Sequence, residues 1–252
     1  MPESASQMSS DPLLLGLLLG TAFIAFVLAS TFGIGGPIIL IPVLMLRLPA
    51  AQAIALVVPV QLCNNLLMLG VQRRHVQLRA ALMTGLSAVP AALIAALLTP
   101  YLDARWLKFG IGVIILAILL HRYGLKLHFT ISERRLLGWG ALIGTISGFT
   151  GNAGPITALA MKGYGLRGGQ LLGTIALLQM ALQLVRLPTY IATGQFPAPF
   201  WWLAALLAVI AMIAVFVGQH LLHRLPGNAF QSLFDSLLLL IALWLLFTAF
   251  HA

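Results

Sequence analysis

Long apolar stretches alternate with short polar ones along most of the chain. Eight of these stretches approach the ~20 residues that an α-helix needs to cross the hydrocarbon core of a membrane. They cover residues 12–29, 51–71, 80–99, 106–121, 136–148, 170–192, 200–222 and 230–250. Because the stretches are apolar throughout rather than at every second position, they predict membrane helices.

The composition indicates the same class of protein. Of 252 residues, 61% are hydrophobic and 8% are charged, with a mean hydropathy of +1.04, whereas soluble domains carry about 25% charged residues. The formal net charge of +9 could indicate a nucleic-acid partner. Most Lys and Arg residues, however, fall in loops that we predict on one side of the membrane. We therefore expect the chain to contact a lipid bilayer and no nucleic acid.

Two short segments, TFGIGGP at 31–37 and FTGNAGP at 149–155, interrupt the apolar stretches in the same way. They coincide when the chain is compared with itself at an offset of 118 residues, which is 155 minus 37. The identical residues are Gly33, Gly36 and Pro37 in the first segment and Gly151, Gly154 and Pro155 in the second, and the residues that follow, Ile38 and Ile156, are also identical.

Two glutamine pairs match at the same offset: Gln52 meets Gln170, and Gln61 meets Gln179. Chance matches are common among leucines but not among glutamines inside apolar stretches. The chain is therefore predicted to consist of two repeats joined by a polar linker. The predicted divisions are an N-terminal tail at 1–11, a first repeat at 12–121, the linker at 122–135 and a second repeat at 136–250.

The charges of equivalent loops predict that the two repeats have opposite orientations. Lys and Arg near the ends of spans favour the cytoplasmic side. The loop at 72–79 is strongly basic, whereas the equivalent segment at 190–197 carries no charge. The basic linker is expected in the cytoplasm and the tail outside. This distribution leaves few Lys and Arg residues on the outer side, namely Arg47, Arg105, Lys108 and Arg186.

The predicted fold is an all-α polytopic membrane protein with two inverted repeats. Each repeat has about five segments, so about 8–10 segments enter the membrane in total. The first two segments of each repeat form a short pair that is broken, or re-entrant, at the glycine–proline motif. Unwound backbone survives at membrane depth only inside protein or beside water.

Each glycine–proline motif is predicted to begin a helix whose N-terminal amides point into the protein. Glycine permits the break, and proline suits the first turn of the next helix. Such a helix end carries partial positive charge and free N–H donors, which bind anions. The candidate substrate-binding residues in the two breaks are Gly33, Gly35, Gly36, Gly151, Asn152 and Gly154. The alternative is that these glycines only allow close helix packing.

Four amide side chains form a second candidate group. Gln61 and Asn65 are spaced i, i+4 and share one helix face, as do their equivalents Gln179 and Gln183. Amides inside a span can donate to oxyanions without the cost of a buried charge. The alternative, which stays equally open, is that they join helices through polar contacts worth about 0.6 kcal/mol each.

Four further residues flank these groups and could add donors: Ser30, Thr31, Thr150 and Arg186. The first three are next to the breaks. Arg186 lies late in its stretch, so it either lines an outer vestibule or extends to the membrane interface, and the second explanation is the commoner one.

The sequence offers little other chemistry. Asp235 is the one acidic candidate inside a span, and Cys63 is the single cysteine. We therefore expect no metal site, no cofactor and no set of catalytic residues, and we do not expect an enzyme.

The paired motifs and the chain length resemble the TauE/SafE family of sulfite and organosulfonate exporters, also called the toluenesulfonate uptake permease family. Its pattern is Gly-x-Gly-Gly-Gly followed by a proline. Residues 33–37 match it, with Pro42 beyond, except that Pro37 replaces the last glycine. Residues 151–155 match it less well.

The resemblance implies transport of small sulfur-containing anions such as sulfite, sulfonates or sulfoacetate. With the inverted repeats, it leads us to expect a secondary transporter or facilitator that works by alternating access around a midplane site. We expect it in the plasma (inner) membrane with the basic loops in the cytoplasm, and a homodimer is the default assembly. The alternatives are a non-transporting membrane scaffold or a permease for a different small ion.

Overall fold

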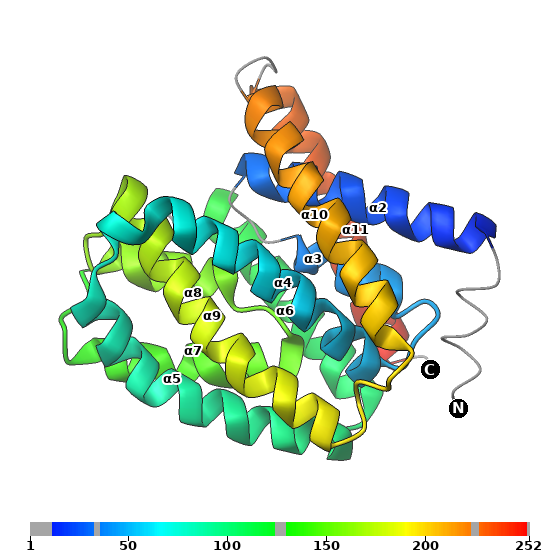
Figure 1. Ribbon diagram of the computed structural model, residues 1–252, viewed down its shortest axis with the longest axis horizontal. Helices are drawn as coiled ribbons and strands as arrows, with labels where there is room; N and C mark the ends of the chain where they lie inside the picture. Colours follow the sequence, from blue (N-terminus) through cyan, green and yellow to red (C-terminus); the bar gives the residue numbers. More distant parts are fainter. Residues whose placement is uncertain (1–11, 33–35, 124–129, 223–226, 251–252) are drawn as a thin grey trace.

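The computed structural model describes residues 12–32, 36–123, 130–222 and 227–250. Within these ranges the chain is helical and contains no strand (Figure 1). The first half forms α2 (Pro12–Phe32), α3 (Pro37–Leu44), α4 (Ala50–Gln72), η1 (Arg73–His75), α5 (Leu78–Leu98), η2 (Thr99–Tyr101) and α6 (Ala104–Tyr123). The second half forms α7 (Arg135–Thr150), α8 (Gly154–Gly163), α9 (Gly168–Ala192), α10 (Phe200–Leu222) and α11 (Gly227–Phe250).

Four helical segments are long and apolar enough to cross a membrane, as judged from length and composition. They are Ala50–His75, Leu78–Tyr101, Gly168–Ala192 and Phe200–Val217, and two shorter apolar helices cover Leu15–Val27 and Leu238–Phe250. The prediction of an all-helical protein with membrane spans is therefore confirmed. The total number of membrane segments, the re-entrant pairs and the inverted orientation stay predictions.

Helices that occupy equivalent places in the two halves also have equivalent packing partners. α5 packs against α7, and their counterparts α10 and α2 pack against each other. α4 packs against α9, and α6 packs against α11, so these four helices contact their own counterparts (Figure 1). Each half thus covers parts of the other half.

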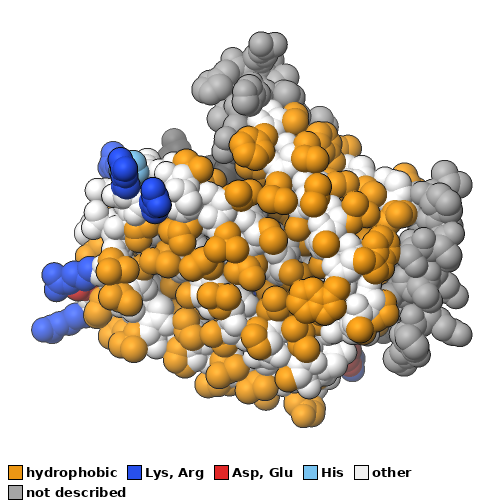
Figure 2. All heavy atoms as spheres, in the orientation of Figure 1, with side chains coloured by type: hydrophobic (Ala, Val, Ile, Leu, Met, Phe, Trp, Pro, Cys, Tyr) orange, Lys and Arg blue, Asp and Glu red, His pale blue; other side chains and the backbone are white. Residues whose placement is uncertain are grey.

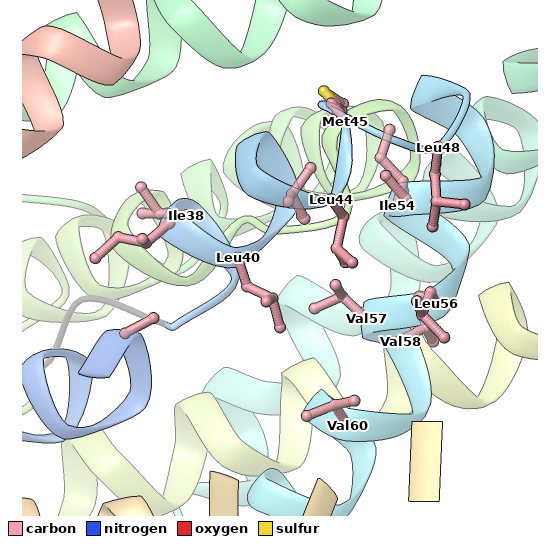
Figure 3. Packing of buried hydrophobic residues seen from close by; sticks show 14 of the residues in the cluster. Ile38, Leu40, Leu44, Met45, Leu48, Ile54, Leu56, Val57, Val58 and Val60 are labelled. Atoms are coloured by element: carbon pink, nitrogen blue, oxygen red, sulfur yellow. The ribbon is translucent and has the colours of Figure 1, made fainter. Parts of the chain in front are cut away.

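The buried apolar residues form two clusters, and each cluster contains residues from both halves. The larger cluster lies among α2, α3, α4, α6, α10 and α11, and the smaller one lies among α5, α7, α8 and α9. Figure 3 shows side chains of α3 within the larger cluster, where Leu40 and Leu44 point toward Val57 of α4. These contacts hold the short helix α3 against the long helix α4.

A row of glycines brings α7 unusually close to α5. Gly140, Gly144 and Gly148 recur every four residues, and a Cβ atom on Gly144 would lie 2.1 Å from the carbonyl oxygen of Ala88. A Cβ on Gly140 would lie 2.2 Å from the carbonyl oxygen of Thr84. Small residues at this spacing let membrane helices approach closely. Close packing is therefore the role of these three glycines, which are distinct from those at the break.

Exposed basic side chains gather mainly at one end of the molecule, whereas most of the visible surface is apolar (Figure 2). Arg73, Arg74 and Arg79 are exposed beside η1. The backbone N–H of Gln77 donates to Thr174 Oγ1 at 2.9 Å, which holds this loop against the first turns of α9. Arg79 also pairs with Glu133, just before α7. The basic loops of both halves therefore lie near one another.

Candidate functional site

The break between α7 and α8 lies inside the protein and is shaped by glycine and asparagine. α7 ends at Gly151, which has a φ of 75°. This left-handed conformation favours glycine and is a common way to end a helix. Asn152 follows and accepts a hydrogen bond at its Oδ1 from the backbone N–H of Gly154, at 2.9 Å. Asn152 therefore occupies one of the donors that a free helix start would offer.

The remaining side-chain donor of this turn has no partner. Asn152 is only 8% exposed, and its Nδ2 makes no hydrogen bond with any described residue. Thr150 Oγ1, by contrast, donates to the carbonyl oxygens of Ile146 and Asn152 at 2.7 and 3.1 Å. The predicted flanking residue Thr150 is therefore used inside the protein, and Asn152 keeps a buried N–H group for another acceptor.

The first break is described only in part. Gly33 and Gly35 lie outside the described residues, as do the side chains of Ser30 and Thr31. Gly36 is buried, and its carbonyl oxygen accepts from the N–H groups of Ile39 and Leu40, both at 3.1 Å. A Cβ on Gly36 would lie 2.6 Å from the ring of Phe26. This glycine is therefore required by packing between α2 and the start of α3.

Three of the four predicted amides form one chain of hydrogen bonds. Asn65 Nδ2 donates to Gln183 Oε1 at 3.1 Å, and Gln183 Nε2 donates to Gln61 Oε1 at 2.9 Å. Gln61 Nε2 then donates to the carbonyl oxygen of Gly151 at 2.7 Å. Gln61 and Gln183 are buried. The chain thus joins α4, α9 and the break between α7 and α8.

The fourth amide, Gln179, bonds to a different partner. Its Nε2 donates to Thr157 Oγ1 at 2.9 Å, and Thr157 in turn donates to the carbonyl oxygen of Ala153 at 2.8 Å. Gln179 Oε1 is buried and has no partner among the described residues. Gln179 therefore links α9 to the first turn of α8, through a threonine that the sequence reasoning did not single out.

Arg186 is buried in the helix bundle, with an exposed fraction of 0%. Its Nη1 donates to the carbonyl oxygen of Ser147 at 2.6 Å. Tyr190, one turn further along α9, donates through its hydroxyl to the carbonyl oxygen of Gly148, also at 2.6 Å. The expectation that Arg186 extends to the membrane interface is wrong, because its position on the helix face directs it toward the end of α7.

The polar residues of α9 share one face. Gln179, Gln183, Arg186 and Tyr190 are spaced at i, i+4, i+7 and i+11, and all four are buried. All but Gln179 act on the last turn of α7, either directly or through Gln61. Side-chain donors from α9 and α4 thus satisfy carbonyl oxygens that a helix end leaves open.

Several buried polar atoms at this place have no partner among the described residues: Asn152 Nδ2, Gln179 Oε1, Ser147 Oγ, Arg186 Nε and Arg186 Nη2. An unpaired buried polar group costs about 1–3 kcal/mol, and more if it is charged. Most of these atoms are donors. Because hydrogen-bond donors outnumber acceptors among these unpaired atoms, the site favours an anion or another ligand rich in acceptors.

The described residues contain no group of three or more His, Cys, Asp or Glu side chains that could hold a metal ion. The polar groups at the break are amides, hydroxyls and one guanidinium. The site therefore provides donors for a ligand and no set of ligands for a metal.

Apolar membrane helices around a buried polar centre define the chain as a polytopic α-helical membrane protein. The model of the sulfite exporter TauE/SafE family matches residues 18–245. The chain therefore belongs to the TauE/SafE family, which is a family of membrane transporters, and the resemblance carried by the glycine–proline motifs is confirmed. Comparisons with curated proteins and with solved structures gave no match.

Proposed function

We propose that this protein transports small sulfur-containing anions, such as sulfite and sulfonates, by alternating access around the α7–α8 break. The observation that supports this proposal best is the concentration of buried N–H groups at one place. Gln61 and Arg186 donate to carbonyl oxygens at the end of α7, and Asn152 Nδ2, Arg186 Nε and Arg186 Nη2 are buried N–H groups with no partner among the described residues. Family membership supports the substrate class.

Neutral amide donors suit the oxygens of a sulfite or sulfonate group. Three oxygens in a pyramidal arrangement can accept hydrogen bonds from several directions, and a helix start adds partial positive charge. A buried carboxylate beside these donors would compete with the anion. Among the described residues, the one buried acid is Asp235 of α11, a helix that packs chiefly against α6.

The amide chain also offers a physical route to alternating access. The bonds from Gln183 to Asn65 and to Gln61 join α9 to α4, and hence one half of the chain to the other. Each amide nitrogen of this chain donates one hydrogen bond within the protein in the described arrangement. An anion that took over their donors would replace the bonds between the halves, so occupancy and relative movement of the halves would be coupled.

We propose the same orientation that the charges predict, with the basic end in the cytoplasm. Arg73 and Arg74 belong to η1, which packs against α9, and Arg79 pairs with Glu133. A shared basic end supports this orientation, because Lys and Arg near span ends favour the cytoplasm.

One observation favours the alternative of a membrane scaffold without transport. Gln61, Asn65 and Gln183 are bonded to each other, as polar residues that only join helices would be. A scaffold does not explain the unpaired donors of Arg186, because a buried guanidinium is costly and an apolar residue would pack as well. The donors of Arg186 therefore favour transport.

Uptake of labelled sulfite and methanesulfonate into proteoliposomes tests the proposal. We expect Gln61→Ala and Gln179→Ala each to lower the uptake rate about 10-fold, which corresponds to the loss of one or two hydrogen bonds. Gln170→Ala is the matched control, because Gln170 is exposed at the first turn of α9. Absence of uptake by the wild-type protein, or full activity of both amide variants, would contradict the proposal.

A further inference from the structure

We infer that Arg186 supplies the positive charge that a bound anion neutralises, and that the site therefore selects monovalent over divalent anions. The inference rests on the proposed function and restricts the proposed substrates by their charge. Alkanesulfonates and hydrogen sulfite carry one negative charge, whereas sulfoacetate and fully deprotonated sulfite carry two. The preferred substrates would then belong to the first group.

Among the Lys and Arg side chains whose burial the structure describes, only that of Arg186 is buried. Its neighbours on α9, Gln183 and Tyr190, are neutral hydrogen-bonding residues that are also buried. No salt bridge joins Arg186 to an acid among the described residues, where the ion pairs are Arg79–Glu133 and Arg105–Asp103. The charge of Arg186 is therefore not neutralised by a side chain.

The guanidinium is fixed at the break itself. The carbonyl oxygen of Ser147 accepts from Arg186 Nη1 at 2.6 Å and also from the backbone N–H of Gly151 at 3.0 Å. The carbonyl oxygen of Gly151 accepts from Gln61. Arg186 and the Gly151 N–H therefore share one acceptor, and the amide chain binds the carbonyl oxygen of the same Gly151.

The C-terminal end of α7 compensates part of the charge. A helix end carries roughly half a negative elementary charge, concentrated on its last carbonyl groups. Arg186 contacts one of these groups, and the start of α8 at the same break carries about half a positive charge, so the site keeps a net charge of about one. Its Nε and Nη2, together with Ser147 Oγ, have no partner among the described residues. These atoms can form a two-pronged contact with oxygens, which is the geometry in which arginine binds oxyanions best.

One anionic charge balances this site, and a second one does not. A monoanion beside Arg186 gives an ion pair with little net charge in a medium of low dielectric constant. A dianion would leave one charge unpaired, which costs several kcal/mol after relaxation. Neutral donors such as Asn152 Nδ2 can bind a further oxygen but cannot cancel a full charge. The same centre would therefore discriminate by charge as well as by shape.

The experiment compares sulfoacetate, a dianion, with sulfoacetamide, a monoanion of nearly the same size. Both displace labelled methanesulfonate from the purified full chain in proteoliposomes. We expect wild-type protein to bind sulfoacetamide at least about 10-fold more tightly than sulfoacetate. The variant Arg186→Gln is expected to lose about 10- to 100-fold in affinity for sulfoacetamide, as for the loss of hydrogen bonds to a charged group, and to lose the preference.

Two further variants keep the test decisive. Arg186→Lys keeps the charge and loses the two-pronged geometry, so we expect weaker binding with the preference for the monoanion retained. Arg167→Gln is the matched control, because Arg167 is exposed just before α9, and it should behave as wild type. If Arg186→Gln does not fold, the wild-type comparison and Arg186→Lys still decide.

Failure of the inference is distinguishable from failure of the proposed function. Equal or stronger binding of sulfoacetate by wild type, or an unchanged preference in Arg186→Gln, would overturn the role of Arg186 while uptake continued. If wild-type protein neither bound nor took up methanesulfonate and sulfite, the proposed function itself would be wrong.

Discussion

Asn65 Nδ2 donates a hydrogen bond to Gln183 Oε1 at 3.1 Å, and the two residues are 118 positions apart. This separation equals the offset at which the glycine–proline segments coincide. In the predicted two-repeat organisation, the two residues are equivalents that contact each other. If a twofold axis relates the halves, it must pass close to this bond, because only residues near such an axis can touch their own counterparts.

This contact predicts an energetic coupling between the halves. We expect a double-mutant cycle of Asn65→Leu and Gln183→Leu to give a coupling energy of about 0.6 kcal/mol, and up to about 1.7 kcal/mol. Reversible unfolding in mixed micelles measures it. Gln170→Leu paired with Asn65→Leu is the control and should be additive, because Gln170 is exposed away from the chain of amides. Additivity in the first cycle would show that the bond contributes nothing.

The glycine row on α7 predicts a position-specific sensitivity to added volume. Gly144→Ala should destabilise the protein by about 1–3 kcal/mol, as overpacking does, because the new Cβ would lie 2.1 Å from the carbonyl oxygen of Ala88. Gly138→Ala is the control on the same helix, since a Cβ there has no neighbour within 4 Å. Thermal unfolding of the two variants checks the difference. Equal stabilities would contradict the described packing of α5 and α7.

Two glycines with positive φ, Gly194 and Gly151, allow the cost of backbone strain to be measured separately from the cost of steric crowding. Gly194→Ala adds a side chain at a φ of 72° in open space, so it should cost only the left-handed penalty of about 1–2 kcal/mol. Gly151→Ala has a φ of 75°, and its Cβ would also lie 2.9 Å from Ile54 Cγ2. We therefore expect Gly151→Ala to lower the unfolding temperature more. The reverse order would contradict the placement of α7 against α4.

The inverted orientation predicts where cysteine-directed reagents react. In a Cys63→Ser background, Arg74→Cys and Ala192→Cys each provide one exposed thiol at opposite ends of the predicted spans. We expect a membrane-impermeant maleimide to label position 192 from outside intact cells and to label position 74 only after permeabilisation. Labelling of both positions from the same side would refute the inverted arrangement.

Much of the helical organisation could be predicted from the sequence, because apolar length and glycine–proline breaks act locally. The predicted stretch at 200–222 agrees with α10 (Phe200–Leu222), and the second break falls between Thr150 and Gly154 as expected. The pairing of α5 with α7 was not foreseen, because contacts between distant segments leave only a weak trace in one sequence. The spacing of Gly140, Gly144 and Gly148 was that trace.

The sequence analysis selected the amide residues of the candidate site, but it did not predict that a charged residue, Arg186, is buried beside them. Gln61, Asn65 and Gln183 were singled out by their helix faces, and the structure joins them in one chain of hydrogen bonds, while their part in binding stays a prediction. The depth of Arg186 along its stretch left two explanations open, an outer vestibule and the membrane interface, and its burial contradicts the interface, which was the commoner one. Its spacing of three residues from Gln183 places it on the amide face, so helix periodicity could have identified it. Tyr190 lies seven residues from Gln183 and falls on the same face, so the same periodicity applies to it. Thr157 gave no such signal, because single hydroxyls are common in membrane helices.

The backbone-to-backbone approach of α5 and α7 has a mechanical consequence. Glycine contacts at carbonyl distance leave no side chains that could slide or change rotamer between these helices, so the pair is stiff. A rocking motion is then expected at other contacts between the helices, such as that between α4 and α9, where the joints are exchangeable amide bonds. The contact between α5 and α7 is therefore rigid, whereas the contact between α4 and α9 can open and re-form.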